Sequence, residues 1–270
     1  MNSVSASKDN RPHIHMPKNF VAVLVLGLIL LGVCILASLV LGSRPITLPE
    51  LIDGLFHPDV DSYGANVVRK RVSRTVFSLF CGAALGVSGA LMQSVTRNPI
   101  ADPSILGVNT GASLFVVSGI AFLNISTANQ YIWLALAGAA VTAVFVFGIG
   151  SMGRGGATPI KLVLAGAATS AALSSLVTAI MIPRAYTMDQ FRFWQVGSVG
   201  SATWSGIATF LPFLVGGVLI AFMTAPALNA LALGDDVATG LGVRAGTMRL
   251  VAALAGVALC GAATALAGPI

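Results

Sequence analysis

Residues 71–111 read R-V-S-R-T-V-F-S-L-F-C-G-A-A-L-G-V-S-G-A-L-M-Q-S-V-T-R-N-P-I-A-D-P-S-I-L-G-V-N-T-G, and this stretch decides the fold. Two arginines, Arg71 and Arg74, precede a charge-free segment that is rich in small residues. A polar segment with two prolines follows at 97–103, and such Asn-Pro and Asp-Pro pairs are typical of turns. A second apolar segment comes next. The order predicts two membrane helices joined in a hairpin, with polar groups at both water-facing ends.

The composition places the whole chain in a membrane. Of its 270 residues 56% are hydrophobic and 9% are charged, and the mean hydropathy is +0.90. Soluble domains carry about 25% charged residues, so this chain could not keep its surface in water. Backbone groups in lipid must be hydrogen-bonded within the protein, and the apolar runs are too long for barrel strands. The predicted fold class is all-α, a polytopic bundle of transmembrane helices.

Seven spans are expected, because about 20 helical residues cross the hydrocarbon core. A polar tail at 1–18 is expected in the cytoplasm, followed by a transmembrane domain at 19–270. Apolar residues within 48–55 share one helical face, which predicts a short amphipathic helix before the second span. The expected spans are Phe20–Leu41, Thr75–Val95, Ile105–Leu123, Tyr131–Gly150, Pro159–Ile182, Trp204–Ala225 and Met248–Ala267.

The positive charge has a membrane explanation. The net charge is +6 and the pI is near 9.7, but lysines and arginines in short loops orient membrane helices, so no nucleic-acid partner is expected. With the N-terminus inside, nearly as many basic residues fall in outer segments as in inner ones, which favours an acidic partner outside. Cys34, Cys81 and Cys260 lie singly in apolar runs, so no disulfide, metal site or cofactor is expected.

Small residues form a stripe along the second span, at Gly82, Gly86 and Gly89. Such stripes let helices approach closely, so packing within the bundle explains them. The alternative is that this helix lines a passage with little side-chain bulk. Met92 and Gln93 lie near its cytoplasmic end, and Gln93 is the polar residue expected to face such a passage.

The two arginines before this span also have two interpretations. Arg71 and Arg74 point the same way at the outer mouth if the helix begins there. They either anchor the span by extending to the interface or form a docking pair for acidic groups on an external protein.

The turn after the span carries helix-start signals. Asp102 followed by Pro103 is typical of an N-cap with proline at the first helical position. Asn98 and Pro99 belong to the same turn. We expect these residues to hold the geometry of the hairpin, and we assign them no catalytic role.

Residues 226–245 form a cytoplasmic insertion in this interpretation. Pro226 is expected to stop the sixth span, and a short apolar helix is expected to end at Gly234 with a left-handed cap. Asp235 is expected to cap a second short helix that ends at Gly242. A plain linker would not need such a surface, so a partner-docking element is favoured over a linker.

Energy for active transport is expected to come from another chain. The sequence has no phosphate-binding loop of the form G-x-x-x-x-G-K-[ST]. The middles of the expected spans hold no charged residue, so no proton or ion relay is indicated. No catalytic residues are expected.

Several blocks of this sequence resemble the signature of FecCD-type permeases, the membrane subunits of bacterial ABC importers for iron–siderophores, haem and cobalamin. The blocks are R-V-S-R followed by G-A-A-L-G-V-S-G-A-L-M-Q and R-N-P-I-A-D-P-S-I-L-G-V-N-T-G-A, then L-V-L-A-G, F-R-F-W-Q-V-G-S, L-A-L-G-D-D-V-A-T-G-L-G-V and A-G-P-I. The resemblance implies ten spans, a second permease copy or paralogue, an ABC ATPase subunit and an external substrate-binding lipoprotein. The chain stops after A-G-P-I, so we expect a C-terminal truncation.

The resemblance also implies roles for particular residues. Arg71 and Arg74 match arginines that pair with glutamates of the binding protein, and Thr158 matches a polar position near the inner gate. The segment 231–243 matches the helices that couple to the ATPase. Its expected contact residues are Leu231, Leu233, Gly234, Asp235, Asp236, Ala238, Leu241, Gly242 and Val243.

The resulting hypothesis is a permease subunit in the bacterial cytoplasmic membrane that moves a ferric siderophore inward. Import of haem or cobalamin by the same family is the first alternative. A secondary transporter or a membrane scaffold is the alternative from another class. A secondary carrier should show an ionisable site within the membrane, and a scaffold would not need the element at 226–245.

Overall fold

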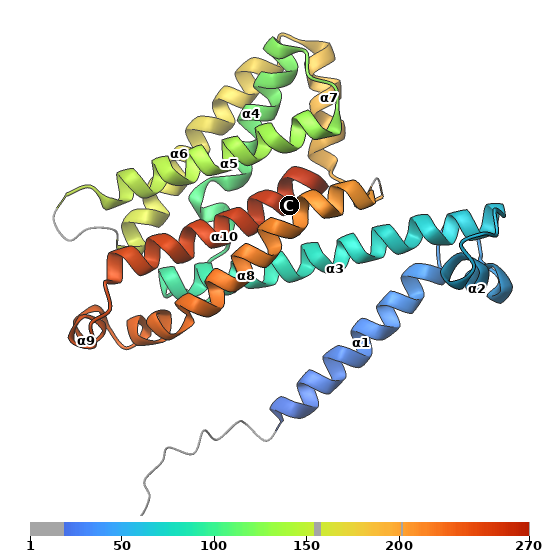
Figure 1. Cartoon of the computed structure of the whole chain (residues 1–270). Helices are drawn as coiled ribbons and strands as arrows, with labels where there is room; N and C mark the ends of the chain where they lie inside the picture. Colours follow the sequence, from blue (N-terminus) through green and yellow to red (C-terminus); the bar gives the residue numbers. More distant parts are fainter. Residues whose placement is uncertain (1–18, 154–157, 201, 270) are drawn as a thin grey trace, which may run out of the picture. The chain divides into compact units, whose positions relative to one another are not determined.

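The computed structural model describes residues 19–153, 158–200 and 202–269, and this part of the chain is all-α, as predicted. The predicted tail at 1–18 lies outside it. The chain divides into two compact units after Thr75, and each unit is described by itself. The second unit contains the bundle that carries the candidate site (Figure 1).

The first unit consists of α1 (Phe20–Val40), α2 (Leu48–Phe56) and the start of α3 (Tyr63–Thr96). The predicted amphipathic helix is confirmed as α2. Its first turn is stabilised by Glu50, whose Oε2 accepts hydrogen bonds from the backbone N–H and the hydroxyl of Thr47, both at 2.9 Å. Gly54 allows α2 to lie directly on Val68 of α3, because a Cβ at this glycine would overlap the valine side chain.

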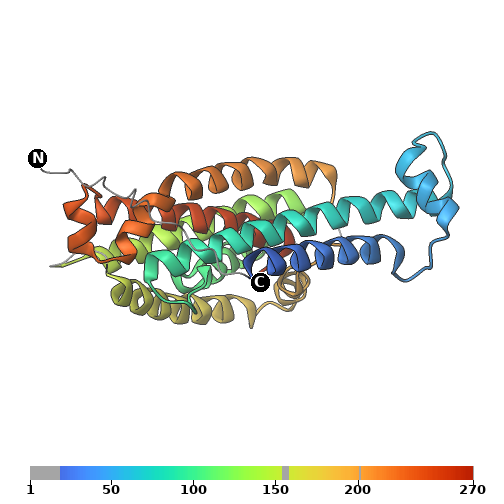
Figure 2. The same cartoon turned by 90° about the horizontal axis from the view of Figure 1, so that it is seen from below.

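Among its described residues, the second unit contains the rest of α3 and seven further α-helices. These are α4 (Val108–Leu123), α5 (Ala128–Ser151), α6 (Pro159–Met181), α7 (Ala185–Val196), α8 (Trp204–Ala232), α9 (Asp235–Gly240) and α10 (Ala245–Ala267). Helix α10 is the most deeply buried of the long helices in the described chain and packs against α8, α5 and α4 (Figure 2). Most of its buried residues are alanine or glycine, so these neighbours approach it closely.

Six described helices are long and apolar enough to cross a membrane, and the third expected span differs from its prediction. It is divided at Gly107, which has φ 72° and ψ 17° and joins a 3-10 turn at Pro103–Leu106 to α4. Helix α4 has 16 residues, so it is about 24 Å long and shorter than a hydrocarbon core of about 30 Å. The left-handed glycine breaks the helix because it redirects the chain between the two segments.

The 3-10 turn is held against α6 by a direct backbone approach. A Cβ at Gly166 of α6 would collide with the carbonyl oxygen of Ile105. Thr110 on the first turn of α4 extends this contact, since its hydroxyl lies 3.2 Å from the hydroxyl of Ser170 on α6. The irregular backbone at 103–107 is thereby packed inside the protein, which is the condition for non-helical backbone at membrane depth.

One prediction about the later helices is wrong, and one helix was not predicted. Pro226 does not stop the sixth span, because α8 continues through it to Ala232. A proline costs a helix one backbone hydrogen bond, but packing of neighbouring helices and threonine side chains compensates for that loss in membrane helices. Thr224 lies two residues before Pro226, and its hydroxyl donates to the carbonyl of Ile220 at 2.8 Å. Between the fifth and sixth expected spans the structure has a further helix, α7, for which no element was predicted.

Candidate functional site

The site lies at the end of the bundle where α8 passes into α10 through α9, opposite the end that carries α7 (Figure 1). Of the two short helices predicted in 226–245, the first is the end of α8 and the second is α9. Gly234 precedes α9 with φ 124° and ψ 152°, which is not the left-handed helical cap that we predicted. Gly242 follows the helix with φ 82°. Both ends of α9 therefore use backbone conformations that favour glycine.

Asp235 is the first residue of α9, and its side chain does not cap the helix as predicted. Its carboxylate instead receives two hydrogen bonds from Arg249 on α10. Arg249 Nη1 donates to Oδ2 at 3.0 Å and Nη2 donates to Oδ1 at 2.7 Å. Arg97, at the end of α3, forms a second ion pair with Oδ1. One carboxylate thus links α9 to the next helix, α10, and to the end of α3, which is distant in the sequence.

The two side chains of the Arg249–Asp235 ion pair differ in exposure. The side chain of Arg249 is 5% exposed, and that of Asp235 is 47% exposed. The hydrogen bonds from Arg249 lower the pKa of the Asp235 carboxyl below its ordinary value of 3.8, and the charges of Arg249 and Arg97 act in the same direction. Asp235 is therefore ionised at neutral pH, and the buried guanidinium keeps its counter-charge.

Helix α9 has one attached face and one free face. Ala238 and Leu231 are buried, so the prediction that they belong to a partner surface is wrong for these two side chains. Val237 on α9 is 48% exposed, and the residues Leu233 before the helix and Leu241 after it are 71% and 67% exposed. Asp236 is exposed and makes no ion pair with a described residue. Val243 turns back onto α9, where its backbone N–H donates to the carbonyl of Ala238 at 2.9 Å.

Arg71 does not present the exposed guanidinium that a docking pair would need. It is 6% exposed, and its guanidinium donates hydrogen bonds to the carbonyls of Leu39, Val40 and Arg44 at 2.7–2.9 Å. The carbonyls of Leu39 and Val40 lie at the C-terminal end of α1, where a helix lacks internal donors, and that of Arg44 lies in the segment after it. Arg74 is half-buried and donates to the carbonyl of Ser38 at 3.3 Å. The pair stabilises the end of α1, and its docking role stays a prediction.

The glycine stripe of α3 is only partly used in packing. Gly82 and Gly86 are exposed and Gly89 is half-buried, and a Cβ at any of the three would meet nothing within 4 Å. Gln93 is also exposed. Met92 is 1% exposed and packs onto Gly256 of α10, so it does not face a passage as predicted. The expected passage face of α3 therefore contains the glycines and Gln93 without Met92.

The hairpin turn confirms the predicted start of the next helical segment. Asp102 Oδ1 accepts a hydrogen bond from the backbone N–H of Ser104 at 2.6 Å, and Pro103 is the first residue of the 3-10 turn. Asn98 acts similarly, since its Oδ1 accepts from the N–H of Ile100 at 3.1 Å. Pro99 lies between these two contacts and is exposed. The same turn begins with Arg97, so its geometry also places the second arginine beside Asp235.

Thr158 lies immediately before α6 and is half-buried. Its side chain makes no capping hydrogen bond to α6. The four residues before it, 154–157, lie outside the described part of the chain. The inner-gate role of Thr158 stays a prediction.

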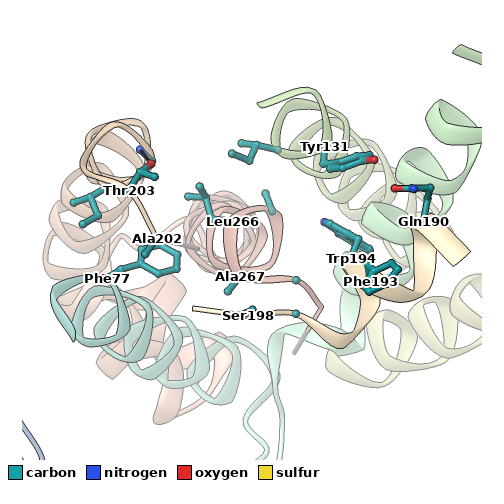
Figure 3. A pocket seen from close by; sticks show the side chains of 16 residues that line it. Phe77, Tyr131, Gln190, Phe193, Trp194, Ser198, Ala202, Thr203, Leu266 and Ala267 are labelled. Carbon is teal, nitrogen blue, oxygen red and sulfur yellow. Dashed lines mark hydrogen bonds between the residues drawn. The ribbon is translucent and has the colours of Figure 1, made fainter. Parts of the chain in front are cut away.

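A pocket of about 270 Å³ lies at the other end of the bundle, between the end of α10 and residues of α3, α5, α7 and α8 (Figure 3). Its wall includes the aromatic residues Phe77, Tyr131, Phe193 and Trp194, with Gln190 and Thr203 as polar neighbours. The indole N–H of Trp194 is buried and has no hydrogen-bond partner among the described residues. Pockets for small molecules measure roughly 300–1,000 Å³, so this one is sized for a small group.

Sequence reasoning missed the two arginines that hold Asp235. Arg97 is 138 positions from Asp235 in the sequence, and Arg249 is 14 positions from it. No local pattern reveals pairings over such separations. One signal was available for Arg249. It is a charged residue within the first turns of an otherwise apolar span, and such residues usually pair with another group.

The chain is similar to known transport proteins. The profile of the FecCD transport family matches residues 29–270. The permease protein YfiZ of Bacillus subtilis, whose name assigns it to siderophore transport, is 42% identical over 200 residues, which are 74% of this chain and 60% of that protein. The ferric enterobactin transport system permease protein FepD of Escherichia coli is 40% identical over 92% of this chain and 75% of its own length. The chain thus spans three fifths to three quarters of these two relatives.

The chain is also similar to a third permease and to a solved transporter structure. The iron(3+)-hydroxamate import system permease protein FhuB of Bacillus subtilis is 39% identical over 93% of this chain and 65% of its own length. A solved inward-facing structure of a metal-chelate type ABC transporter matches with a TM-score of 0.72 at 25% identity, over 93% of this chain and 77% of that one.

Proposed function

Since the chain belongs to the FecCD transport family, we propose that it is the permease subunit of an ATP-driven importer that moves an iron(III)–siderophore complex across the bacterial cytoplasmic membrane. The chain is a multi-pass membrane protein, and it is not an enzyme, because the family separates the permease from the ATPase. An ABC ATPase, an external substrate-binding lipoprotein and a second permease copy or paralogue are the proposed partners.

The exposed face of α9 carries this proposal. Leu233, Val237 and Leu241 present apolar side chains outside the spanning helices, and Ala238 and Asp235 attach the same helix to the bundle. A surface helix that is held on one face and apolar on the other suits a partner that must push on the bundle. We propose that the ATPase binds this face and that the α9 end of the bundle, with the N-terminus, is cytoplasmic.

The opposite end of the bundle is then external and receives the substrate-binding protein. A docking role for Arg71 and Arg74 would require their guanidinium groups to leave the carbonyls of α1 or to share them with carboxylates. The open glycine face of α3, at Gly82 and Gly86, supports a passage or an interface with the second permease, since no described side chain would be in contact with a Cβ there.

The substrate follows from the relatives. Their names give siderophore, ferric enterobactin and iron(3+)-hydroxamate transport. These compounds are ferric chelates with different donor groups, so we propose the class of ferric siderophores for this chain.

Leu241→Glu tests the ATPase surface. A carboxylate in the centre of an apolar interface must lose its water, so we expect the amount of ATPase that copurifies with the permease to fall at least tenfold. Leu48→Glu is a matched control, because Leu48 on α2 is 69% exposed and Leu241 is 67% exposed. Full copurification with Leu241→Glu would overturn the assignment of this surface.

Uptake into proteoliposomes that contain the whole transporter tests the substrate. Labelled ferric enterobactin, a ferric hydroxamate and ferric citrate are compared with labelled cobalamin and haem. We expect ATP-dependent uptake of at least one ferric siderophore. Uptake confined to cobalamin or haem would refute the substrate class while leaving the permease role in place.

A further inference from the structure

We propose that Arg249 is the positioning residue through which α9 moves α10, with Asp235 as the linking group and Arg97 as a second attachment on α3. The proposal rests on the proposed function, because it explains how a push from the ATPase on α9 reaches the transmembrane helices. It assigns a force-transmitting role to an ion-pair cluster at the start of α10.

The link has the geometry of a rigid joint. Both nitrogens of the Arg249 fork donate to both oxygens of Asp235, at 2.7 and 3.0 Å. Two parallel hydrogen bonds fix the orientation of the carboxylate as well as its distance. Arg249 lies in the second turn of α10 and is 4% exposed, so its own side chain is held by the surrounding helices.

The rest of the attachment of α9 is weaker. Gly234 and Gly242 flank the helix, have positive φ angles, and would have open space around a Cβ. The buried apolar contact of α9 itself is the methyl group of Ala238. A six-residue helix between two glycines can turn about its ends, and the ion pair to Arg249 opposes that rotation.

Arg97 adds a connection in a second direction. It follows α3, has φ 52°, and pairs with the same carboxylate oxygen that accepts from Arg249 Nη2. The arginines therefore hold Asp235 between the end of α3 and the start of α10. Movement of α9 away from either helix must break a charge-assisted hydrogen bond.

Helix α10 carries the movement onward. It has 23 residues, so it is about 34 Å long. Its first turns hold Arg249, and its last residues, Ala265 to Ala267, line the aromatic pocket at the other end of the bundle (Figure 3). A displacement at α9 thus reaches this pocket through one continuous helix.

Spin labels test the link without any partner. One label replaces Val237 on α9 and one replaces Leu254 on α10, both exposed, in a chain with Cys34→Ser, and the distance distribution is measured in detergent by electron paramagnetic resonance. With Asp235→Asn we expect the distribution to become at least twofold broader. Asp236→Asn is the control, since this neighbouring carboxylate is exposed and unpaired among the described residues. An unchanged width with Asp235→Asn would overturn the proposal.

A second experiment uses the assembled transporter. We expect Arg249→Lys to keep ATPase copurification and ATP hydrolysis within about twofold and to lower the siderophore moved per ATP at least tenfold. A structural role alone would lower folded protein, copurification and transport together, and that result would overturn the proposal. If the unaltered complex hydrolyses ATP and moves no ferric siderophore, the proposed function fails, and the spin-label result still decides whether Arg249 holds α9.

Discussion

Replacing Gly166 by alanine tests the contact between α6 and the 3-10 turn before α4. The new Cβ would collide with the carbonyl oxygen of Ile105, which is backbone and cannot move as a side chain would. Overpacking of a buried site costs about 1–3 kcal/mol, and the better helix propensity of alanine offsets up to about 1 kcal/mol. Because the turn must shift as a unit, we expect a cost near the upper end of this range. The free energy of unfolding should then fall by about 2 kcal/mol.

A thiol-reactive dye can follow the unfolding in detergent. Cys81 and Cys260 are free and buried, so they react only as the bundle opens, and Cys34 is exposed and gives a constant background. A loss of about 2 kcal/mol lowers the midpoint by about 4–8 °C for a chain of this size. Gly86→Ala is the matched control, since a Cβ there meets nothing within 4 Å. A Gly166→Ala midpoint equal to or above that of the unaltered protein would refute the reasoning.

The first remaining prediction concerns Arg71→Ala, which removes the donors from the carbonyls of Leu39, Val40 and Arg44; we expect faster proteolysis within 41–47 and unchanged cleavage elsewhere. Equal cleavage rates there would show that α1 does not depend on this residue. The second concerns pH. Because the pKa of Asp235 is lowered on folding, its contribution to stability is complete above the ordinary value of 3.8 and is lost as the pH falls through the lower folded value. The difference in midpoint between the unaltered protein and Asp235→Asn should therefore shrink below pH 3.8, and a constant difference would contradict this account.

Local patterns predicted local structure well. The apolar face within 48–55 predicted α2, and Asp102 with Pro103 predicted the start of the 3-10 turn. The long apolar runs gave the all-α fold and the approximate places of the spans. These features depend on residues within a few positions of one another, so they can be predicted from a single sequence.

Features that depend on distant partners were predicted poorly. Pro226 was expected to end a helix, but packing around α8 carries that helix to Ala232. The hydrogen bonds of Arg71 to carbonyls about 30 residues earlier were not predicted, because they leave no trace in the local pattern. The pairing of Asp235 with Arg249 depends on how α9 folds back on α10. In each case the tertiary environment decides between local alternatives.

The small side chains of α10 have a mechanical consequence. Ten of the residues that it buries between Ala252 and Ala265 are alanine, glycine, cysteine or threonine, and Leu259, which fits over Gly217 of α8, is the largest side chain in that stretch. Few of its side chains interlock with neighbouring helices, so sliding or turning about the helix axis requires few rotamer changes. Helix α10 therefore suits shear, in which a helix slips by a small distance along its neighbours while the packing of the bundle is retained.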